Sequence, residues 1–155
     1  MDYQHHGETL PDFPSPTHGG FPRCRYGIGN GILPFRTPAE ALAMVTPSAP
    51  NHEVLASNYK KDIQALVWDP WKLMRCITTG NPVPVPDGTR PMTHREIAAC
   101  QGFPNHFVFF PDGVRKRIGN AVPPPLATAL YHKVMGSLRT TGRLGETASS
   151  RLWGM

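Results

Sequence analysis

The strongest structural signal in this chain of 155 residues is the stretch Arg90-Pro-Met-Thr-His-Arg-Glu-Ile-Ala-Ala-Cys-Gln-Gly-Phe-Pro104. Thr93 and Glu96 have the spacing of a capping box, in which each side chain accepts a hydrogen bond from the backbone N–H of the other. The expected buried face of the helix that they open is made of Ile97, Ala98 and either Cys100 or Gln101. Gly102 is expected to end this helix, because a glycine followed closely by a proline stops helical backbone.

Downstream of this helix the sequence predicts a core segment, a turn and a longer helix. The aromatic residues are expected in the core rather than as base-stacking platforms, and they are Phe103, Phe107, Phe109 and Phe110. Gly119-Asn120 predicts a turn. A helix is expected after Pro123-Pro124-Pro125, because apolar residues then recur at steps of three and four residues. They are Leu126, Ala129, Leu130, Val134 and Leu138.

Upstream, residues 1–38 are dense in proline and glycine and are expected to form loops. Thr37-Pro38-Ala39-Glu40 is a second capping box, with proline at the first helical position, and predicts a helix through Val45. The region 46–89 shows little periodicity. It predicts a short helix around Asn58–Asp62, a short strand over Arg75–Thr79, and turns at Gly80–Pro82 and Pro84–Gly88.

These signals divide the chain into four segments. Residues 1–38 form a Pro/Gly-rich loop segment, 39–89 a short variable segment, 90–142 the strongly patterned part, and 143–155 a tail that is expected to be disordered. The fold class predicted from them is mixed α/β and rich in loops, with a few helices packed on short strands.

Composition excludes several classes of protein. The longest apolar run is Ala41–Val45, far short of the roughly 20 residues that span a bilayer, so no membrane segment is expected. The first residues have neither a basic start nor an apolar stretch, which argues against a secretory signal. Three cysteines at wide spacing, without a CxxC pair, predict reduced thiols rather than a disulfide framework or a zinc ribbon.

Positive charge is concentrated in the second half of the chain. The formal net charge is +5; seven basic residues stand against eight acidic ones up to residue 89, and eight against two from 90 to 143. A phosphate backbone is a natural partner for such a surface, and the run Arg115-Lys116-Arg117 could contact phosphate oxygens. A solvated basic face that keeps the protein soluble is the alternative.

Two blocks resemble one family. Arg90–Pro104 is similar to the ninth motif of DNA (cytosine-5) methyltransferases, and Ile118-Gly-Asn-Ala-Val-Pro-Pro-Pro-Leu-Ala127 is similar to their tenth motif. Pro14-Ser15-Pro16-Thr17-His18-Gly19 resembles the segment that follows the family's eighth motif. The stretch Trp68–Gly80 resembles the fungal branch of the family, which is linked to silencing of repeated DNA.

The resemblance implies a partner, a co-substrate and candidate site residues. The partner is DNA, and the co-substrate is S-adenosylmethionine, whose pocket the tenth motif lines through Asn120, Ala121 and Val122. Candidate DNA-binding residues are Arg90, Arg95, Arg115, Lys116 and Arg117. For the first two, the alternative is surface salt bridges with acids such as Asp87. The implied fold is the C-terminal part of an S-adenosylmethionine-dependent α/β methyltransferase with a small recognition lobe, in which residues 39–89 are a short target-recognition-like segment. The implied location is the nucleus.

The catalytic motifs of the resembled family are missing from the sequence. No Pro-Cys dipeptide is present, since Cys24 and Cys76 follow arginine and Cys100 follows alanine, and no Glu-Asn-Val block occurs. The chain is therefore expected to lack catalytic residues and to be inactive alone, with a separate catalytic half as a possible partner. Two alternatives stay open: a non-catalytic DNA-binding remnant that uses the basic part, and a fragment without a settled fold.

Overall fold

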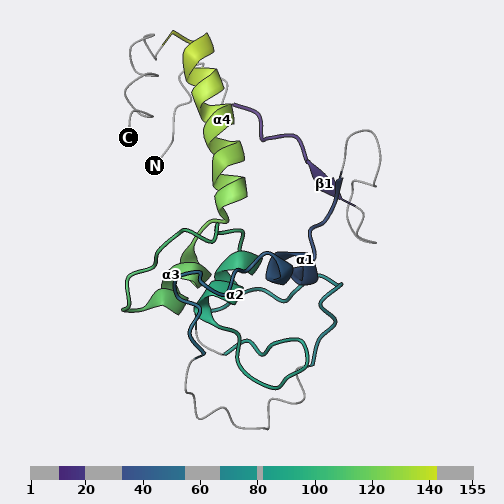
Figure 1. The fold of residues 1–155 in the computed structure, drawn as a ribbon. Coiled ribbons are helices and arrows are strands. Elements are labelled where there is room, and N and C mark those ends of the chain that lie inside the picture. The colour runs from purple at the N-terminus through teal and green to yellow at the C-terminus, as the bar shows by residue number, and fades with distance from the viewer. Residues whose placement is uncertain (1–10, 20–32, 55–66, 80–81, 143–155) are drawn as a thin grey trace, which may run out of the picture. The chain divides into compact units, whose positions relative to one another are not determined.

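The computed structural model describes residues 11–19, 33–54, 67–79 and 82–142. The elements in chain order are β1 (His18–Gly19), β2 (Leu33–Pro34), α1 (Pro38–Ala43), α2 (His94–Cys100), α3 (Val114–Asn120) and α4 (Pro124–Thr140), as Figure 1 shows. The chain divides into two units, residues 16–124 and the two ends, 1–15 with 125–155. The first unit holds α1, α2 and α3, with α2 packed against both of the other helices.

Helices α1 and α2 begin on the two predicted capping boxes. In α2 the Glu96 N–H donates to Thr93 Oγ1 at 3.2 Å and the Thr93 N–H donates to Glu96 Oε2 at 2.7 Å. In α1 the corresponding pair is Thr37 with Glu40. Gly102, with φ of 88°, ends α2 as expected. The structure ends α1 at Ala43, two residues before the predicted end.

Helix α3 is an element that the sequence prediction missed. Its first residue, Val114, and Ile118 four residues later are both buried, which is the spacing of one helix face. Gly119 and Asn120 are the last two residues of this helix, so the predicted Gly-Asn turn is wrong. The left-handed residue lies instead at Gly113, where φ is 66° just before the helix.

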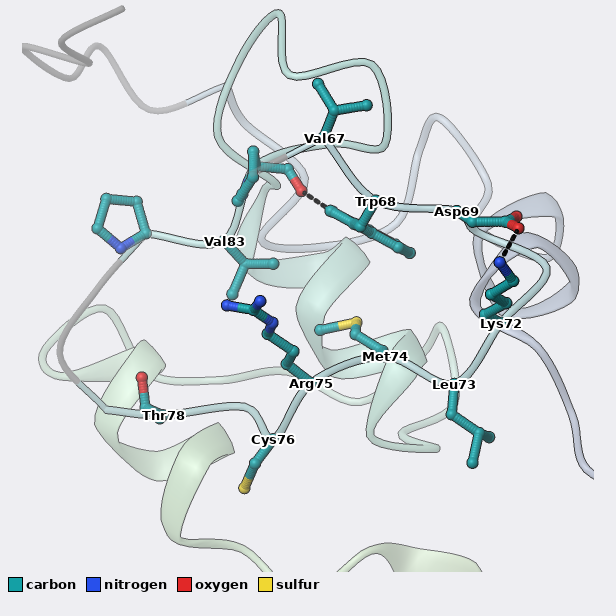
Figure 2. A pocket seen from close by; sticks show the side chains of 12 residues that line it. Val67, Trp68, Asp69, Lys72, Leu73, Met74, Arg75, Cys76, Thr78 and Val83 are labelled. Carbon is teal, nitrogen blue, oxygen red and sulfur yellow. Dashed lines mark hydrogen bonds and ion pairs between the residues drawn. The ribbon is translucent and has the colours of Figure 1, made fainter. Parts of the chain in front are cut away.

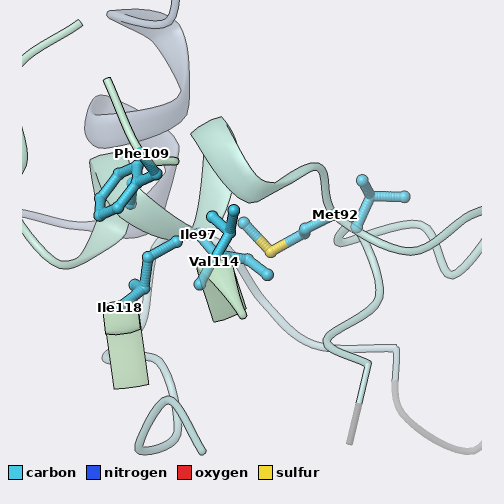
Figure 3. Packing of buried hydrophobic residues seen from close by; sticks show 7 residues of the cluster. Met92, Ile97, Phe109, Val114 and Ile118 are labelled. Atoms are coloured by element: carbon cyan, nitrogen blue, oxygen red, sulfur yellow. The ribbon is translucent and has the colours of Figure 1, made fainter. Parts of the chain in front are cut away.

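The core of the first unit is a cluster around α2 and α3 (Figure 3). It contains Val85, Met92, Ile97, Ala98, Phe109, Val114 and Ile118. Phe103 packs against this cluster, and its ring lies 5.0 Å from those of both Phe107 and Phe109. Phe107 and Phe110 are 42% and 75% exposed, so the prediction that all four phenylalanines are core residues is wrong for these two.

The segment before α2 forms a narrow turn. Val85 N–H donates to the Arg90 carbonyl and Met92 N–H to the Val83 carbonyl, at 2.9 and 2.7 Å, and Gly88 adopts φ of 71°. The turn predicted at Pro84–Gly88 is confirmed. The strand predicted over Arg75–Thr79 is wrong, because those residues are irregular. The helix predicted around Asn58–Asp62 and most of the turn at Gly80–Pro82 lie outside the described residues.

Residues 78–79 pass very close to α3. A Cβ built on Gly119 would lie 3.0 Å from Thr79 Cγ2 and 3.2 Å from the carbonyl carbon of Thr78. The helix therefore needs a glycine at this position, because any side chain would press on the neighbouring backbone.

Strand is scarce in the described part of the chain. Strands β1 and β2 pair in parallel over two residues each, with His18 opposite Leu33 and Gly19 opposite Pro34. The described residues are otherwise helix and loop, so the structure by itself supports the predicted α/β class only loosely.

Helix α4 confirms the longer helix predicted after the three prolines. It spans 17 residues and none of them is buried. Leu126 and Val134, on its predicted apolar face, are 48% and 46% exposed. Among the described residues, none of the helices has the length and apolar character that crossing a membrane requires.

Candidate functional site

Arg90 and Glu96 form a bidentate ion pair at the start of α2. Nη1 and Nη2 of Arg90 donate to the two carboxylate oxygens of Glu96 at 2.8 and 2.7 Å. The acid that Arg90 engages is therefore Glu96, rather than the Asp87 considered from the sequence. The same carboxylate accepts from the Thr93 N–H. Arg90 thus locks the capping box of α2 in place.

Electrostatics around Glu96 follow from this geometry. Burial raises the pKa of the Glu96 carboxyl, but hydrogen bonds from Arg90 and Thr93, together with the charges of Arg90 and His52, more than offset it. The net result is a pKa below the ordinary value. The bond to Glu96 correspondingly raises the pKa of Arg90.

Arg95 is completely buried, with an exposed fraction of 0%. Its guanidinium donates to the carbonyls of Pro50 at 2.9 Å, Pro104 at 2.8 Å and Phe107. The central carbon of the guanidinium, Cζ, also lies 5.8 Å from the centre of the Phe109 ring. Burial lowers the pKa of Arg95. The side chain proposed from the sequence as a DNA contact is here an internal brace between α2 and two loops.

Asn51 completes this brace, and the sequence analysis missed it. Its side-chain amide donates to the Phe109 carbonyl at 3.2 Å and accepts from the Phe109 N–H at 3.0 Å. Its own carbonyl accepts from the Arg95 N–H at 2.9 Å. Asn51 adopts φ of 62°, a region where asparagine is enriched. The only sequence signal was an asparagine after a proline.

The cation run on α3, Arg115, Lys116 and Arg117, differs in exposure along its length. Lys116 and Arg117 are exposed, whereas Arg115 is partly buried. Nε and Nη2 of Arg115 are buried without a hydrogen-bond partner. Arg117 makes one long hydrogen bond, 3.3 Å to the Phe110 carbonyl. No described acid forms an ion pair with these three side chains, so their charge remains uncompensated.

The side chain of His94 is affected by the positive charge of Arg115. Burial lowers the pKa of His94, the positive charge of Arg115 lowers it further, and Glu53 opposes the shift weakly. Burial and the nearby guanidinium thus both favour the neutral form of this imidazole at the start of α2.

Residues 120–122 follow the cation run after Ile118 and Gly119, at the end of α3. The Asn120 side chain is exposed and Val122 is 55% exposed. The Ala121 backbone is already bonded: its N–H donates to the Ile118 carbonyl and its carbonyl accepts from Gln101 Nε2 at 3.0 Å. The polar and apolar groups that this stretch can offer a ligand are therefore the side chains of Asn120 and Val122.

The two cysteines in the described residues, Cys76 and Cys100, are free. Burial, with a smaller contribution from the negative charge of Glu96, raises the pKa of the Cys100 thiol to about 12. A thiol with that pKa stays protonated near neutral pH and is a poor nucleophile. Cys76 is exposed, and Cys24 lies outside the described residues. In the part of the chain described, no cluster of histidine, cysteine and carboxylate side chains is suited to hold a metal ion.

Comparison with known proteins finds relatives that are DNA (cytosine-5)-methyltransferases. DNA (cytosine-5)-methyltransferase 3 of Arabidopsis thaliana is 30% identical over 139 residues, which cover 84% of this chain and 9% of that protein. DNA (cytosine-5)-methyltransferase 1 of Mus musculus is 34% identical over 90 residues, 52% of this chain and 5% of the mouse protein. A bacterial relative, type II methyltransferase M1.HphI of Haemophilus parahaemolyticus, is 46% identical over 48 residues, 30% of this chain and 13% of that protein.

The chain therefore spans about a tenth or less of the length of the first two relatives. No solved structure matches it significantly. The model of the C-5 cytosine-specific DNA methylase family matches residues 24–136, which include α1, α2, α3 and most of α4. This match suggests the fold of S-adenosylmethionine-dependent methyltransferases. Because it covers well over half of the residues, the chain belongs to the C-5 cytosine-specific DNA methylase family.

Proposed function

We propose that this chain is the C-terminal portion of a DNA (cytosine-5)-methyltransferase, which transfers a methyl group from S-adenosylmethionine to C5 of cytosine in DNA. The observation that carries the proposal is the family match over residues 24–136, which contains both late sequence blocks in the family's order. In this proposal residues 39–89 belong to the recognition region, and residues 90–142 carry the late motifs.

Residues Asn120–Val122 are proposed as one wall of the S-adenosylmethionine pocket. The exposed Asn120 amide can both donate and accept hydrogen bonds, and the exposed Val122 side chain offers an apolar surface. A co-substrate with polar and apolar parts suits these two side chains. When bound, it supplies an electrophilic methyl group. Ala121 contributes by fixing the backbone at the end of α3, since both of its backbone groups are bonded within the protein.

The cation run on α3 is proposed to contact the DNA backbone. Lys116 and Arg117 are exposed, and no acid in the described residues forms an ion pair with them, which leaves them available to phosphate oxygens. Arg115, with two unpartnered nitrogens, adds positive charge beneath them. Arg90 and Arg95 are proposed as positioning residues, because both guanidinium groups are engaged inside the protein.

The nucleophile is proposed to come from outside this chain. Methylation at C5 needs a thiolate that adds to C6 of an extruded cytosine, and such a thiolate must be activated by its surroundings. The buried Cys100 thiol, with a pKa of about 12, cannot serve, and no cysteine here follows a proline.

We also propose the branch of the family to which the chain belongs and its location in the cell. The stretch Trp68–Gly80 supports assignment to the fungal, repeat-silencing branch, and activity on chromosomal DNA would place the protein in the nucleus. The comparisons do not favour the alternative of a non-catalytic remnant.

The test uses the purified chain and double-stranded DNA. Binding should weaken linearly on a plot of log affinity against log salt, and Lys116→Glu with Arg117→Glu should weaken binding to all sequences alike. Lys133→Glu on α4 reverses a single charge, so it is the matched control for Lys116→Glu and for Arg117→Glu, each also measured alone. Unchanged affinity in the α3 variant would refute the phosphate role.

A further inference from the structure

A cavity of about 470 Å³ lies between residues 67–78 and residues 82–84 (Figure 2). Figure 2 shows the side chains of Trp68, Met74, Arg75 and Val83 directed toward its centre, whereas Cys76 points away. Its volume falls in the range of about 300–1,000 Å³ that is typical of ligand sites. None of these residues belongs to the cofactor wall or to the cation run described above.

The walls of the cavity are held in place by hydrogen bonds. The Trp68 indole N–H donates to the Pro84 carbonyl at 3.0 Å, which joins its two sides. The Asp69 carboxylate accepts from the Trp71 N–H at 3.0 Å, and the Pro70 carbonyl accepts from the Ala39 N–H of α1 at 2.9 Å. The cavity is therefore formed before any ligand arrives, which lowers the entropic cost of binding.

Charge at the cavity is positive on one side. Lys72 is paired with Asp69 at 3.5 Å. Arg75 is exposed and forms no ion pair with any acid in the described part of the chain. Its guanidinium lies beside Val83 in Figure 2. An apolar cavity bordered by an unpaired guanidinium complements a ligand that carries an apolar group next to an anion.

The polar groups of the cavity decide between two classes of ligand. A nucleobase has several hydrogen-bonding edge atoms, and burying them without partners is costly. The indole N–H is already used by Pro84, so the centre of the cavity offers Trp68, Met74 and Val83 as apolar surface rather than as readers of base edges. An aliphatic or aromatic amino-acid side chain makes no such demand.

Exposed apolar side chains continue around the cavity, because Val67 and Leu73 line it and Trp71 lies between them in the chain. Val67, Trp71 and Leu73 are 62%, 69% and 45% exposed. Tryptophan, methionine and arginine are enriched at protein interfaces, and an apolar patch with a polar rim marks such surfaces. The surroundings therefore suit a longer polypeptide ligand.

We propose that this cavity is a docking site for a protein segment that inserts a large apolar side chain and places a carboxylate against Arg75. The cavity lies within the proposed recognition region, residues 39–89, but shares no residue with the proposed co-substrate wall or with the DNA contacts proposed for α3.

The experiment uses the full chain and fluorescein-labelled eight-residue peptides in which Leu or Phe stands directly before or after Asp. The matched peptides carry Asn in place of Asp. In fluorescence anisotropy at low salt, at least one acidic peptide should bind roughly fivefold more tightly than its neutral partner. Arg75→Gln should remove this difference, whereas Lys116→Gln, which deletes one exposed cation elsewhere, should preserve it.

Two further measurements locate the binding and test the rival ligand. The acidic peptide should shift the NMR resonance of the Trp68 indole N–H, which is assigned with Trp68→Phe. Val83→Phe, checked for folding by circular dichroism, should weaken peptide binding by filling the cavity. The proposal is overturned if no peptide binds, if Arg75→Gln changes nothing, or if a thymidine oligonucleotide displaces the peptide and itself depends on Arg75.

Discussion

The brace formed by Arg95 gives the sharpest prediction on stability. Arg95→Leu removes a buried guanidinium that serves three carbonyls, those of Pro50, Pro104 and Phe107. Leucine keeps apolar volume in the site but donates no hydrogen bond. The three carbonyls would then remain buried without their partner, and two loops would lose their attachment to α2.

The magnitude follows from these contacts. Leaving one buried polar group without a hydrogen bond costs about 1–3 kcal/mol of stability. Three carbonyls lose their donor here, so the total cost before any compensation is at the upper end of this range or above it. Part of this cost is offset, because the variant no longer buries a guanidinium that pairs with none of the carboxylates in the described residues. We expect a net loss of about 3 kcal/mol, a large share of the 5–15 kcal/mol that stabilises an ordinary domain. Arg95→Lys keeps the charge but not the planar fork, so it should lose about half as much.

The assay is urea unfolding followed by far-UV circular dichroism. With a slope of about 2 kcal/mol per molar urea, Arg95→Leu should lower the midpoint by roughly 1.5 M. Arg117→Leu is the matched control, because this exposed arginine makes a single long hydrogen bond; it should change stability by no more than about 0.5 kcal/mol. If the two variants have the same midpoint, Arg95 is not a structural brace.

Three other predictions test separate parts of the structure. Gly119→Ala should lower the free energy of unfolding by about 1–3 kcal/mol through its contact with residues 78–79, whereas Gly136→Ala, which meets nothing within 4 Å, should raise helix stability by about 0.5–1 kcal/mol; thermal melts of both variants check this. The lowered pKa of Glu96 means that its contribution to stability is present above the ordinary carboxyl pKa and is lost as pH falls through the lower value of the folded state. Glu96→Gln should therefore make the free energy of unfolding depend less steeply on pH in the acid range. The same acid dependence in the variant and the original protein would contradict the ion pair with Arg90. At pH 8, iodoacetamide should alkylate Cys76 before Cys100 in peptide mapping by mass spectrometry, and equal labelling would refute the burial of Cys100.

The sequence predicted those helices and helix ends that depend on residues only a few positions apart. Both capping boxes, the end of α2 at Gly102 and the long helix α4 depend on residues close together in the chain, and all are present. Helix α3 was missed because its basic run was interpreted only as surface charge. The apolar pair Val114 and Ile118 was the available signal.

Features that depend on contacts distant in sequence could not be predicted. The arginine at position 95 looked like a surface cation, yet the loops around Pro50 and Phe107 enclose it. Asn51 bonds Phe109, 58 residues away, and no pattern connects the two. The same holds for the cavity, because the hydrogen bond from Trp68 to Pro84 joins a stretch without periodic signal to a predicted turn, and no sequence pattern connects the two. Candidate site residues in contiguous runs, such as Lys116 and Arg117, were easier to propose.

One gel experiment tests most directly whether this chain holds DNA without its own nucleophile. The purified chain is incubated with S-adenosylmethionine and a duplex containing 5-fluorodeoxycytidine, then divided between a native gel and a denaturing gel. The account predicts a salt-sensitive shift on the native gel and no protein–DNA adduct on the denaturing gel. A band that survives denaturation would mean that one of the three cysteines attacks cytosine, which would contradict the assignment of the catalytic thiol to another polypeptide segment.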